Sequence, residues 1–322
     1  MTARRITCAL VLLAWARPAG AQQKIILRQQ FPPGRYVLDV KGKLKQSVKV
    51  NKARSRGVEI SRRLLLDMRV LPADGQGVTR MELSFRRIVY KVVSRGRSMA
   101  YDSAEDPPQL GRLGQLLGPL AEAKVSVAIG ADGSVAEVRG LDEVWDARSR
   151  KDPDVQTWLK QTKAEMGDAM IRELFEQVPA FLPDGAVARG QSWKTKTSFT
   201  MPYVGKRECD QRVTLKTVGA EEGRQVAHLD LAGKTTDAGV TDARADEMPL
   251  TLRKSRVAQR GQVSLEVKTH LPLSFSIDRD CVLEMTGKDP RKGAFTVVFS
   301  RSRSRIVTLR PDKNAGAKTG GN

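Results

Sequence analysis

The chain contains few of the residues that most catalytic and metal sites require. It has two histidines and three cysteines in 322 residues, and only 5% of its residues are Phe, Trp or Tyr. Two histidines exclude a histidine-rich metal site, and three cysteines exclude a dense disulfide scaffold. The sequence also lacks a phosphate-binding G-x-x-x-x-G-K-[ST] loop, a G-x-S-x-G nucleophile elbow and an H-E-x-x-H zinc motif. We therefore predict no catalytic residue, no cofactor, no metal and no enzyme activity.

The two histidines, His228 and His270, lie outside any catalytic motif. His228 stands beside Leu229 and Asp230 within a predicted strand. A Ser–His–Asp arrangement in space is conceivable, but no local pattern selects a serine. We interpret both histidines as structural or surface residues, with a hydrolase kept as a third functional alternative.

Long apolar runs are scarce, and the one at the N-terminus is short. Arg4 and Arg5 precede an apolar stretch over residues 6–16, and small residues lead to an expected cleavage near Ala21. This pattern predicts a signal peptide over residues 1–21 and a periplasmic or extracellular protein. The alternative is a short membrane anchor, but the run is too brief to span about 30 Å of hydrocarbon. We expect no transmembrane segment in the mature chain.

Two cysteines, Cys209 and Cys281, remain once the leader with Cys8 is removed. An even number in an oxidising compartment predicts one disulfide. Both residues share strand parity with apolar neighbours, so both thiols would point to the same apolar side of a sheet. The alternative is two separate buried thiols.

Charge is strongly one-sided. The chain has 56 Lys and Arg against 36 Asp and Glu, a formal charge of +20, and loss of three leader arginines leaves 20 − 3 = +17. Arg301, Arg303 and Arg305 alternate with serines, so their guanidinium groups share one strand face. Such a ladder would suit an anionic envelope polymer, whereas the scarcity of aromatics argues against specific nucleic-acid binding. The alternative is a solvated face. Phe299 and Val307 have the same parity, which requires either a bulge or a face that runs from core to wet rim.

The dominant pattern in the chain is the two-residue alternation of β-strands. Between Tyr36 and Val50 most even positions are apolar, and most odd positions are charged. The apolar even positions are Tyr36, Leu38, Val40, Leu44, Val48 and Val50. The phase of the alternation flips at Arg86-Arg87, which predicts a bulge. The Asp132-Gly133 pair between two short strands predicts a hairpin.

Helical periodicity is confined to two segments. Apolar residues recur at three- and four-residue spacing over residues 154–178, before a stop at Pro179. A shorter helix is predicted over residues 109–121, although three glycines weaken that pattern.

The two halves of the chain resemble one another. Each opens with a glycine close to an aromatic residue and ends with a hairpin whose turn contains Asp, which we interpret as an internal duplication. The alternative is that all antiparallel meanders look alike. The predicted units are a signal peptide (1–21), an N-terminal β unit (22–150), a connecting helix (151–182), a C-terminal β unit (183–310) and a disordered tail (311–322).

Three short motifs follow one another in a recognisable order. They are Tyr101-Asp102-Ser103, the hairpin with Asp132-Gly133, and Leu182-Pro183 followed by Gly190-Gln191-Ser192-Trp193. This order resembles an uncharacterised family of bacterial exported proteins and lipoproteins, a domain of unknown function, over roughly residues 30–290. The resemblance implies an exported location and a shared architecture, and it implies no activity. Many relatives look like lipoproteins, whereas this sequence lacks a lipobox cysteine at the cleavage site. We interpret Asp102 as part of an Asx-type turn.

Together these patterns predict a mainly β fold (β-rich α+β). We expect two related curved antiparallel sheets or half-barrels bridged by one amphipathic helix. Such sheets would enclose an apolar groove lined by Trp158, Leu174 and Phe175, which predicts a non-enzymatic carrier or sensor of an apolar or amphiphilic ligand such as a lipid. The alternative is an envelope structural or scaffolding protein that binds an anionic polymer or another protein through basic sheet faces.

Overall fold

The computed structural model describes eight ranges of the chain. The predicted signal peptide, Trp158 and all of the predicted tail except Pro311 and Asp312 lie outside them. The ranges are 24–106, 111–151, 162–163, 165–201, 205–237, 242–245, 248–289 and 293–312.

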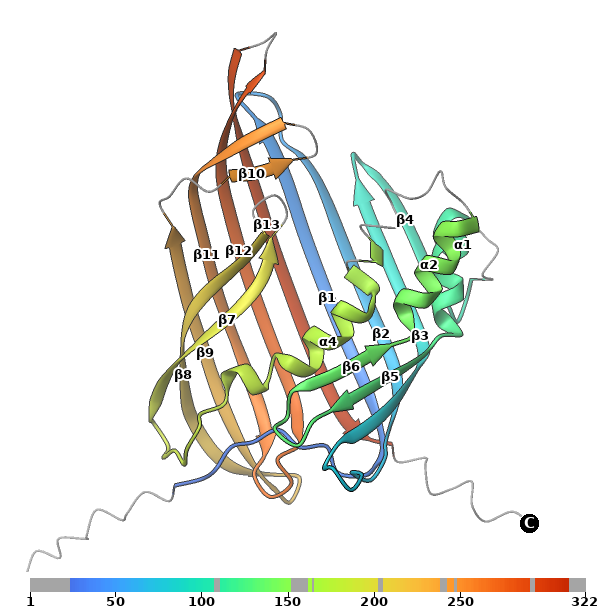
Figure 1. The fold of residues 1–322 in the computed structure, drawn as a ribbon, viewed down its shortest axis with the longest axis vertical. Helices are drawn as coiled ribbons and strands as arrows, with labels where there is room; N and C mark the ends of the chain where they lie inside the picture. Colours follow the sequence, from blue (N-terminus) through green and yellow to red (C-terminus); the bar gives the residue numbers. More distant parts are fainter. Residues whose placement is uncertain are drawn as a thin grey trace, which may run out of the picture.

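Within these ranges, thirteen strands form a single antiparallel sheet (Figure 1). The strands of the first half are β1 (Gly34–Val50), β2 (Arg56–Val70), β3 (Thr79–Ser94), β4 (Arg97–Asp102), β5 (Lys124–Ile129) and β6 (Val135–Arg139). The strands of the second half are β7 (Ser192–Met201), β8 (Gly205–Glu221), β9 (Arg224–Asp237), β10 (Asp242–Ala245), β11 (Met248–Glu266), β12 (Pro272–Asp289) and β13 (Gly293–Pro311). The order across the sheet is β6-β5-β3-β2-β1-β13-β12-β11-β9-β8-β7, with β4 beside β3 and β10 beside β11.

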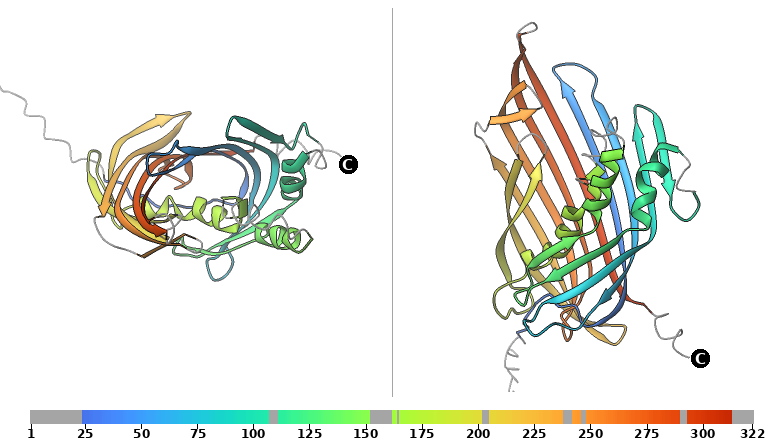
Figure 2. Two further views of the ribbon diagram at one scale, coloured as in Figure 1. Left: turned by 90° about the horizontal axis from the view of Figure 1, so that it is seen from above. Right: turned by 45° about the vertical axis from the view of Figure 1, so that its right-hand side comes forward.

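The first and last long strands join the two halves. β1 pairs with β13 without a register shift, from Tyr36 opposite Pro311 to Val50 opposite Val297. The two β units expected from the sequence are therefore halves of one continuous sheet. Seen from above, this sheet curves into a trough whose mouth is crossed by helices (Figure 2). The prediction of a mainly β fold with a curved antiparallel sheet is confirmed.

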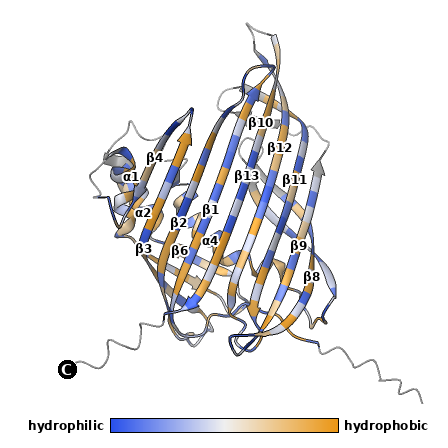
Figure 3. Cartoon of the chain, turned by 180° about the vertical axis from the view of Figure 1, so that it is seen from behind, coloured by the Kyte–Doolittle hydropathy of each residue, from blue (hydrophilic) through white to orange (hydrophobic). Residues whose placement is uncertain are grey.

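Alternation along the strands gives the sheet two different faces. The hydropathy colouring shows orange and blue bands that alternate along each strand (Figure 3). The phase flip at Arg86 is a bulge, because Leu65 and Leu66 pair with Arg87 and Phe85 and leave Arg86 without a partner. The bulge prediction is confirmed.

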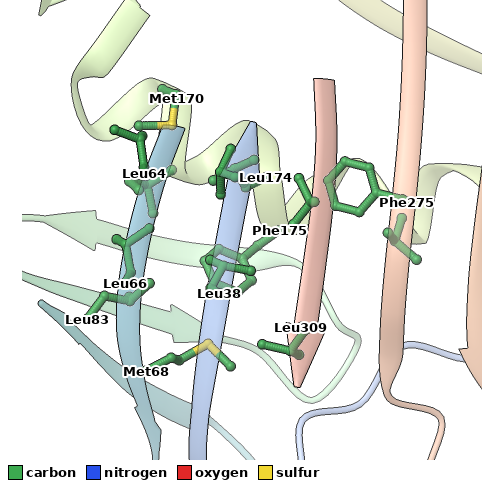
Figure 4. Close-up of a cluster of buried hydrophobic side chains, with 14 of the residues drawn as sticks. Leu38, Leu64, Leu66, Met68, Leu83, Met170, Leu174, Phe175, Phe275 and Leu309 are labelled. Carbon is green, nitrogen blue, oxygen red and sulfur yellow. The ribbon is translucent and has the colours of Figure 1, made fainter. Parts of the chain in front are cut away.

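The concave face carries two apolar clusters. The large cluster includes Leu38, Leu66, Leu83, Phe275 and Leu309. Figure 4 shows these side chains beneath Met170, Leu174 and Phe175 of a helix. The small cluster comprises Phe199, Cys209, Leu250, Leu252, Val257, Cys281, Leu283, Met285, Val297 and Phe299.

The helices are α1 (Gly111–Ala121), α2 (Leu141–Lys151), α4 (Asp168–Glu176) and the 3₁₀ turn η2 (Pro179–Phe181). α1 confirms the predicted short helix, whereas α2 was not predicted. None of the described helices is long and apolar enough to cross a membrane.

The predicted continuous helix over residues 154–178 is wrong, because Gly167 interrupts it. Gly167 has an extended backbone, and α4 begins after it. Asp142 of α2 accepts a hydrogen bond from the backbone N of Asp168 at 3.0 Å, and Asp168 accepts one from the backbone N of Leu141 at 2.8 Å. The two helix starts therefore cap each other, which stabilises a new helix start at Asp168.

The disulfide prediction is corrected as well. Cys209 and Cys281 both face the small cluster, as their parity predicted, but both are free thiols. β9 and β11 lie between their strands, so three strand spacings of about 4.8 Å separate them along the sheet. A disulfide requires Cα atoms within about 7 Å. Parity placed the thiols on one face, but strand order keeps them apart.

Candidate functional site

A row of polar and charged side chains crosses the concave face between the two apolar clusters. Gln211, Gly233, Gln259, Arg279 and Arg303 are successive partners on five neighbouring strands. With neighbouring residues of the same face they form what we call the arginine belt: Arg62, Thr197, Gln211, Gln259, Arg279, Arg301, Arg303 and Arg305.

The order of residues along two strands locates this belt. On β12, Arg279 stands between Ile277 of the large cluster and Cys281 of the small one. On β13, the three belt arginines stand between Phe299 of the small cluster and Val307 of the large one. The belt therefore separates two apolar surfaces.

Arg301, Arg303 and Arg305, the predicted polyanion contact, share a face with Phe299 and Val307, which is the second of the two alternatives that their parity left open. β13 pairs with both neighbours in continuous register, so no bulge turns these side chains outward. They point into the trough, and Arg305 is 3% exposed. Their shared parity with Phe299 correctly indicated this placement, because arginines on the same strand face as buried apolar residues point into the core with them.

Two carboxylates reach the belt from the helical segment over the trough. Glu165 lies 2.5 Å from Arg301 Nη2 and 3.6 Å from Arg303 Nη2. The Glu165 carboxylate is also 3.6 Å from Arg62 Nη1. The same nitrogen donates a hydrogen bond to the backbone oxygen of Glu165.

Glu173 of α4 makes the second set of ion pairs. It lies 3.0 Å from Arg305 and 3.4 Å from Arg303. Burial alone would raise the pKa of Glu173, but the charges of Arg305, Arg303 and Arg279 outweigh it and hold the pKa at about 2. Burial and the charge of Arg303 lower the pKa of Arg305 to about 9, so both groups stay charged at neutral pH.

Arg279 has different partners. Its Nε donates to Gln259 Oε1 at 2.7 Å, and its guanidinium lies 4.1 Å from the centroid of the Phe199 ring, a cation–π contact. Beside it, Gln211 donates to Thr197 Oγ1. Gly233 makes room for this arrangement, because a Cβ there would stand 2.8 Å from Gln211 Cγ.

The predicted apolar groove is closed in this structure. Leu174 and Phe175 are each 4% exposed, and Phe175 meets Phe31 edge to face at 5.5 Å. The cavity that they line with Leu38 and Phe275 has a volume of about 20 Å³. That is room for about one water molecule and far too little for a lipid chain.

His228 lies on the outer face of the sheet. Its Nδ1 is 3.1 Å from Ser264 Oγ and its Nε2 is 2.7 Å from Glu221, whose side chain is 55% exposed. A catalytic triad instead links serine to Nε2 and the carboxylate to Nδ1. The arrangement is the reverse of that expected for a hydrolase.

The outer face also contains two wide, shallow grooves. One, of about 720 Å³, is lined by both signs of charge, including Arg35, Arg86, Glu82 and Asp312. The other, of about 510 Å³, includes Arg260. Three exposed lysines of β1, Lys41, Lys43 and Lys45, pair with acids, for example Lys43 with Glu59 at 2.9 Å. Mixed charge makes the outer face a weak polyanion surface.

The short motifs quoted above have structural roles. Asp102 accepts a hydrogen bond from the backbone N of Ala104 at 3.1 Å, which is the predicted Asx-type turn, and it also pairs with Arg87. Asp132 accepts from Ser134 N at 2.9 Å in the predicted hairpin. Trp193 Nε1 donates to Phe181 O at 2.9 Å and so fixes β7 to η2.

Sequence reasoning missed the two belt carboxylates and Arg62. Glu173 and Gln177 are four residues apart on one helix side, and Glu165 lies eight residues before Glu173. This polar stripe on an otherwise apolar segment was the sequence signal that could have identified the two carboxylates. Arg62 shares parity with Leu64 and Leu66, which predicts that it points into the core.

Comparisons with solved structures give low scores. A structure described as lipid–protein interactions in lipovitellin has a TM-score of 0.47 at 12% identity, over 89% of this chain and 26% of the lipovitellin chain. This chain thus spans about a quarter of that protein. Pseudomonas aeruginosa OccK7 (OpdD) has a TM-score of 0.22 at 9% identity, over 86% of this chain and 100% of that one. These scores support no conclusion about ligands.

No curated protein matches the sequence. A family model matches residues 76–271, which is more than half of the chain and includes the Tyr-Asp-Ser, Asp-Gly and Gly-x-x-Trp segments. The resemblance to an uncharacterised family is confirmed: the chain belongs to the Family of unknown function (DUF6263).

Proposed function

We propose that this protein is an exported, non-enzymatic binding protein that takes up an amphiphilic ligand on the concave face of its sheet. One observation carries the proposal: helices cover the trough where strand pairing would otherwise close it. β6 and β7 are the two ends of the described strand order, and α4 lies across the mouth between them (Figure 2).

A helical cover is easier to move than a strand. α4 contacts the sheet through side chains, with Leu174 and Phe175 on the large cluster and Glu173 on the belt. Lifting it breaks no sheet hydrogen bond. The apolar surface beneath would then accept a ligand chain, and polar groups lie next to it, as an amphiphile requires. The cavity of about 20 Å³ belongs to the closed state, in which α4 packs on the sheet.

Lipid retention is the direct test. Native mass spectrometry of the mature protein, purified without detergent, is expected to show a bound amphiphile that organic extraction releases. An uncharged fluorescent probe, N-phenyl-1-naphthylamine, is expected to bind and to be displaced by the extract. Absence of both would reject the proposal.

A variant of the cover sharpens the test. Phe175→Ala opens space next to the existing cavity, so it is expected to raise probe affinity several-fold while costing about 3–5 kcal/mol of stability. The matched control is Val282→Ala, because Val282 is 42% exposed on the outer face. Equal probe binding by the two variants would place the probe away from the trough.

The alternative, an envelope scaffold that binds an anionic polymer through basic sheet faces, has less support. Its arginine ladder points inward, and Lys41, Lys43 and Lys45 on the outer face of β1 lie within 4.0 Å of carboxylates. Retention on heparin that is lost only as the salt concentration is raised would support this alternative, and elution already at low salt would argue against it.

A further inference from the structure

Among the residues that the structure describes, the arginine belt carries more charge than its neighbours neutralise. Five guanidinium groups face the carboxylates of Glu165 and Glu173, so the side chains that the structure describes there sum to 5 − 2 = +3. Charges removed from water require partners of opposite sign. An anion from outside the chain would supply them.

Unpartnered hydrogen-bond donors mark where that anion would sit. Gln259 is 1% exposed, and its Nε2 has no partner among the atoms that the structure describes. The same holds for Arg301 Nε. Arg279 lies between these two residues on the sheet, and no described carboxylate forms an ion pair with it. Buried donors without acceptors are rare in folded proteins, and an anion offers acceptors only.

The surroundings of these donors identify the rest of the ligand. The Arg279 guanidinium rests on Phe199, and Cys281 follows it two residues along β12, both in the small apolar cluster. An apolar chain attached to the anion would lie on that cluster. The belt is reachable from solvent, since the Glu173 side chain is 35% exposed and that of Arg303 is 21% exposed.

From these observations we infer that Gln259, Arg279 and Arg301 bind the anionic head group, carboxylate or phosphate, of an amphiphile whose chain lies on the small apolar cluster. The inference rests on the proposed uptake of an amphiphile on the concave face. It adds the head-group class and places the chain on the small cluster, across the belt from the large cluster beneath α4. Glu165 already shows the chemistry, because its carboxylate accepts from Arg301 Nη2 at 2.5 Å.

The first experiment compares head groups on one chain. The mature wild-type protein is titrated by calorimetry with dodecyl phosphate, dodecanoate, dodecanol and dodecyltrimethylammonium below their micelle concentrations, and with inorganic phosphate. The two anionic amphiphiles are expected to bind at least tenfold more tightly than dodecanol, and inorganic phosphate at least tenfold more weakly than dodecyl phosphate.

The second experiment locates the preference. Arg279→Met is expected to reduce the preference for dodecanoate over dodecanol about tenfold. Arg260→Met is the matched control, because Arg260 follows Gln259 on β11 and is exposed on the outer face. The control is expected to retain the wild-type preference. The wild-type comparison needs no variant, so unfolding of Arg279→Met would leave the test intact.

The outcomes separate the two proposals. If dodecanol binds as tightly as dodecanoate, the head-group site is rejected while amphiphile binding stands. If no twelve-carbon probe binds, the proposed function fails and this inference fails with it. Phosphate that binds as tightly as dodecyl phosphate, or a loss of preference in Arg260→Met, also overturns the head-group assignment.

Discussion

Two adjacent arginines on β2 form ion pairs in opposite surroundings. Arg63 points outward to Asp39 at 2.8 Å, and its side chain is 49% exposed. Arg62 points inward to Glu165 at 3.6 Å, and its side chain is 6% exposed. A single step along a strand reverses the face of the sheet. The same residue type is therefore a solvated surface group at one position and part of the arginine belt at the next.

The difference appears in the direction of the pKa shifts. The hydrogen bond and charge of Asp39 raise the pKa of Arg63, whereas burial lowers the pKa of Arg62 despite the nearby Glu165. Water screens the outer pair and screens the inner one far less. Loss of one partner should therefore cost much more inside the trough than outside it.

The largest effect is expected from Glu165→Gln. It leaves Arg62, Arg301 and Arg303 without their shared carboxylate, so the free energy of unfolding is expected to fall by about 3–5 kcal/mol. Urea unfolding followed by circular dichroism measures this. Glu82→Gln is the control, because Glu82 pairs with Arg69 at 3.7 Å on the outer face and is 61% exposed. Equal losses in both variants would remove the distinction between the faces.

The next effect concerns acid. Because the pKa of Glu173 is lowered to about 2 in the folded protein, its contribution to stability is fully present above its unfolded value of 4.5. That contribution is expected to disappear as the pH falls from about 4.5 to about 2. Stability measured across this window should decline less steeply in Glu173→Gln than in wild type.

The outer face provides the control for this acid dependence. A hydrogen bond from Lys43 lowers the pKa of Glu59 at the surface, where water weakens the interaction. Glu59→Gln should keep the wild-type slope. If Glu59→Gln flattened the decline of stability with pH as much as Glu173→Gln does, the belt would not be the source of the acid dependence.

The smallest effect is expected from Asp39→Asn. Its pair with Arg63 is exposed, so the loss should be at most about 1 kcal/mol. The loss should shrink further in 1 M sodium chloride, where the screening length is about 3 Å. The loss in Glu165→Gln should change little with salt. Thermal unfolding of both variants at two salt concentrations tests the contrast, and equal salt sensitivity would contradict it.

Local patterns predicted the features that depend on neighbours in sequence. The alternation from Tyr36 to Val50 became β1, and the phase flip at Arg86 became a bulge. The Asp102 turn also followed from adjacent residues. The helix interruption at Gly167 was missed because its cause is Asp142, which packs from a separate helix.

The order of residues in β13 determined that its three arginines share a face with Phe299 and Val307, because side chains alternate strictly along a strand. Only the tertiary structure decided which face the helical segment covers, and so which arginines meet Glu165 and Glu173. Strand order likewise decided that Cys209 and Cys281, which parity places on one face, stay unlinked. Periodicity acts within a strand, whereas the partners of a side chain depend on contacts between segments that are more than a hundred residues apart.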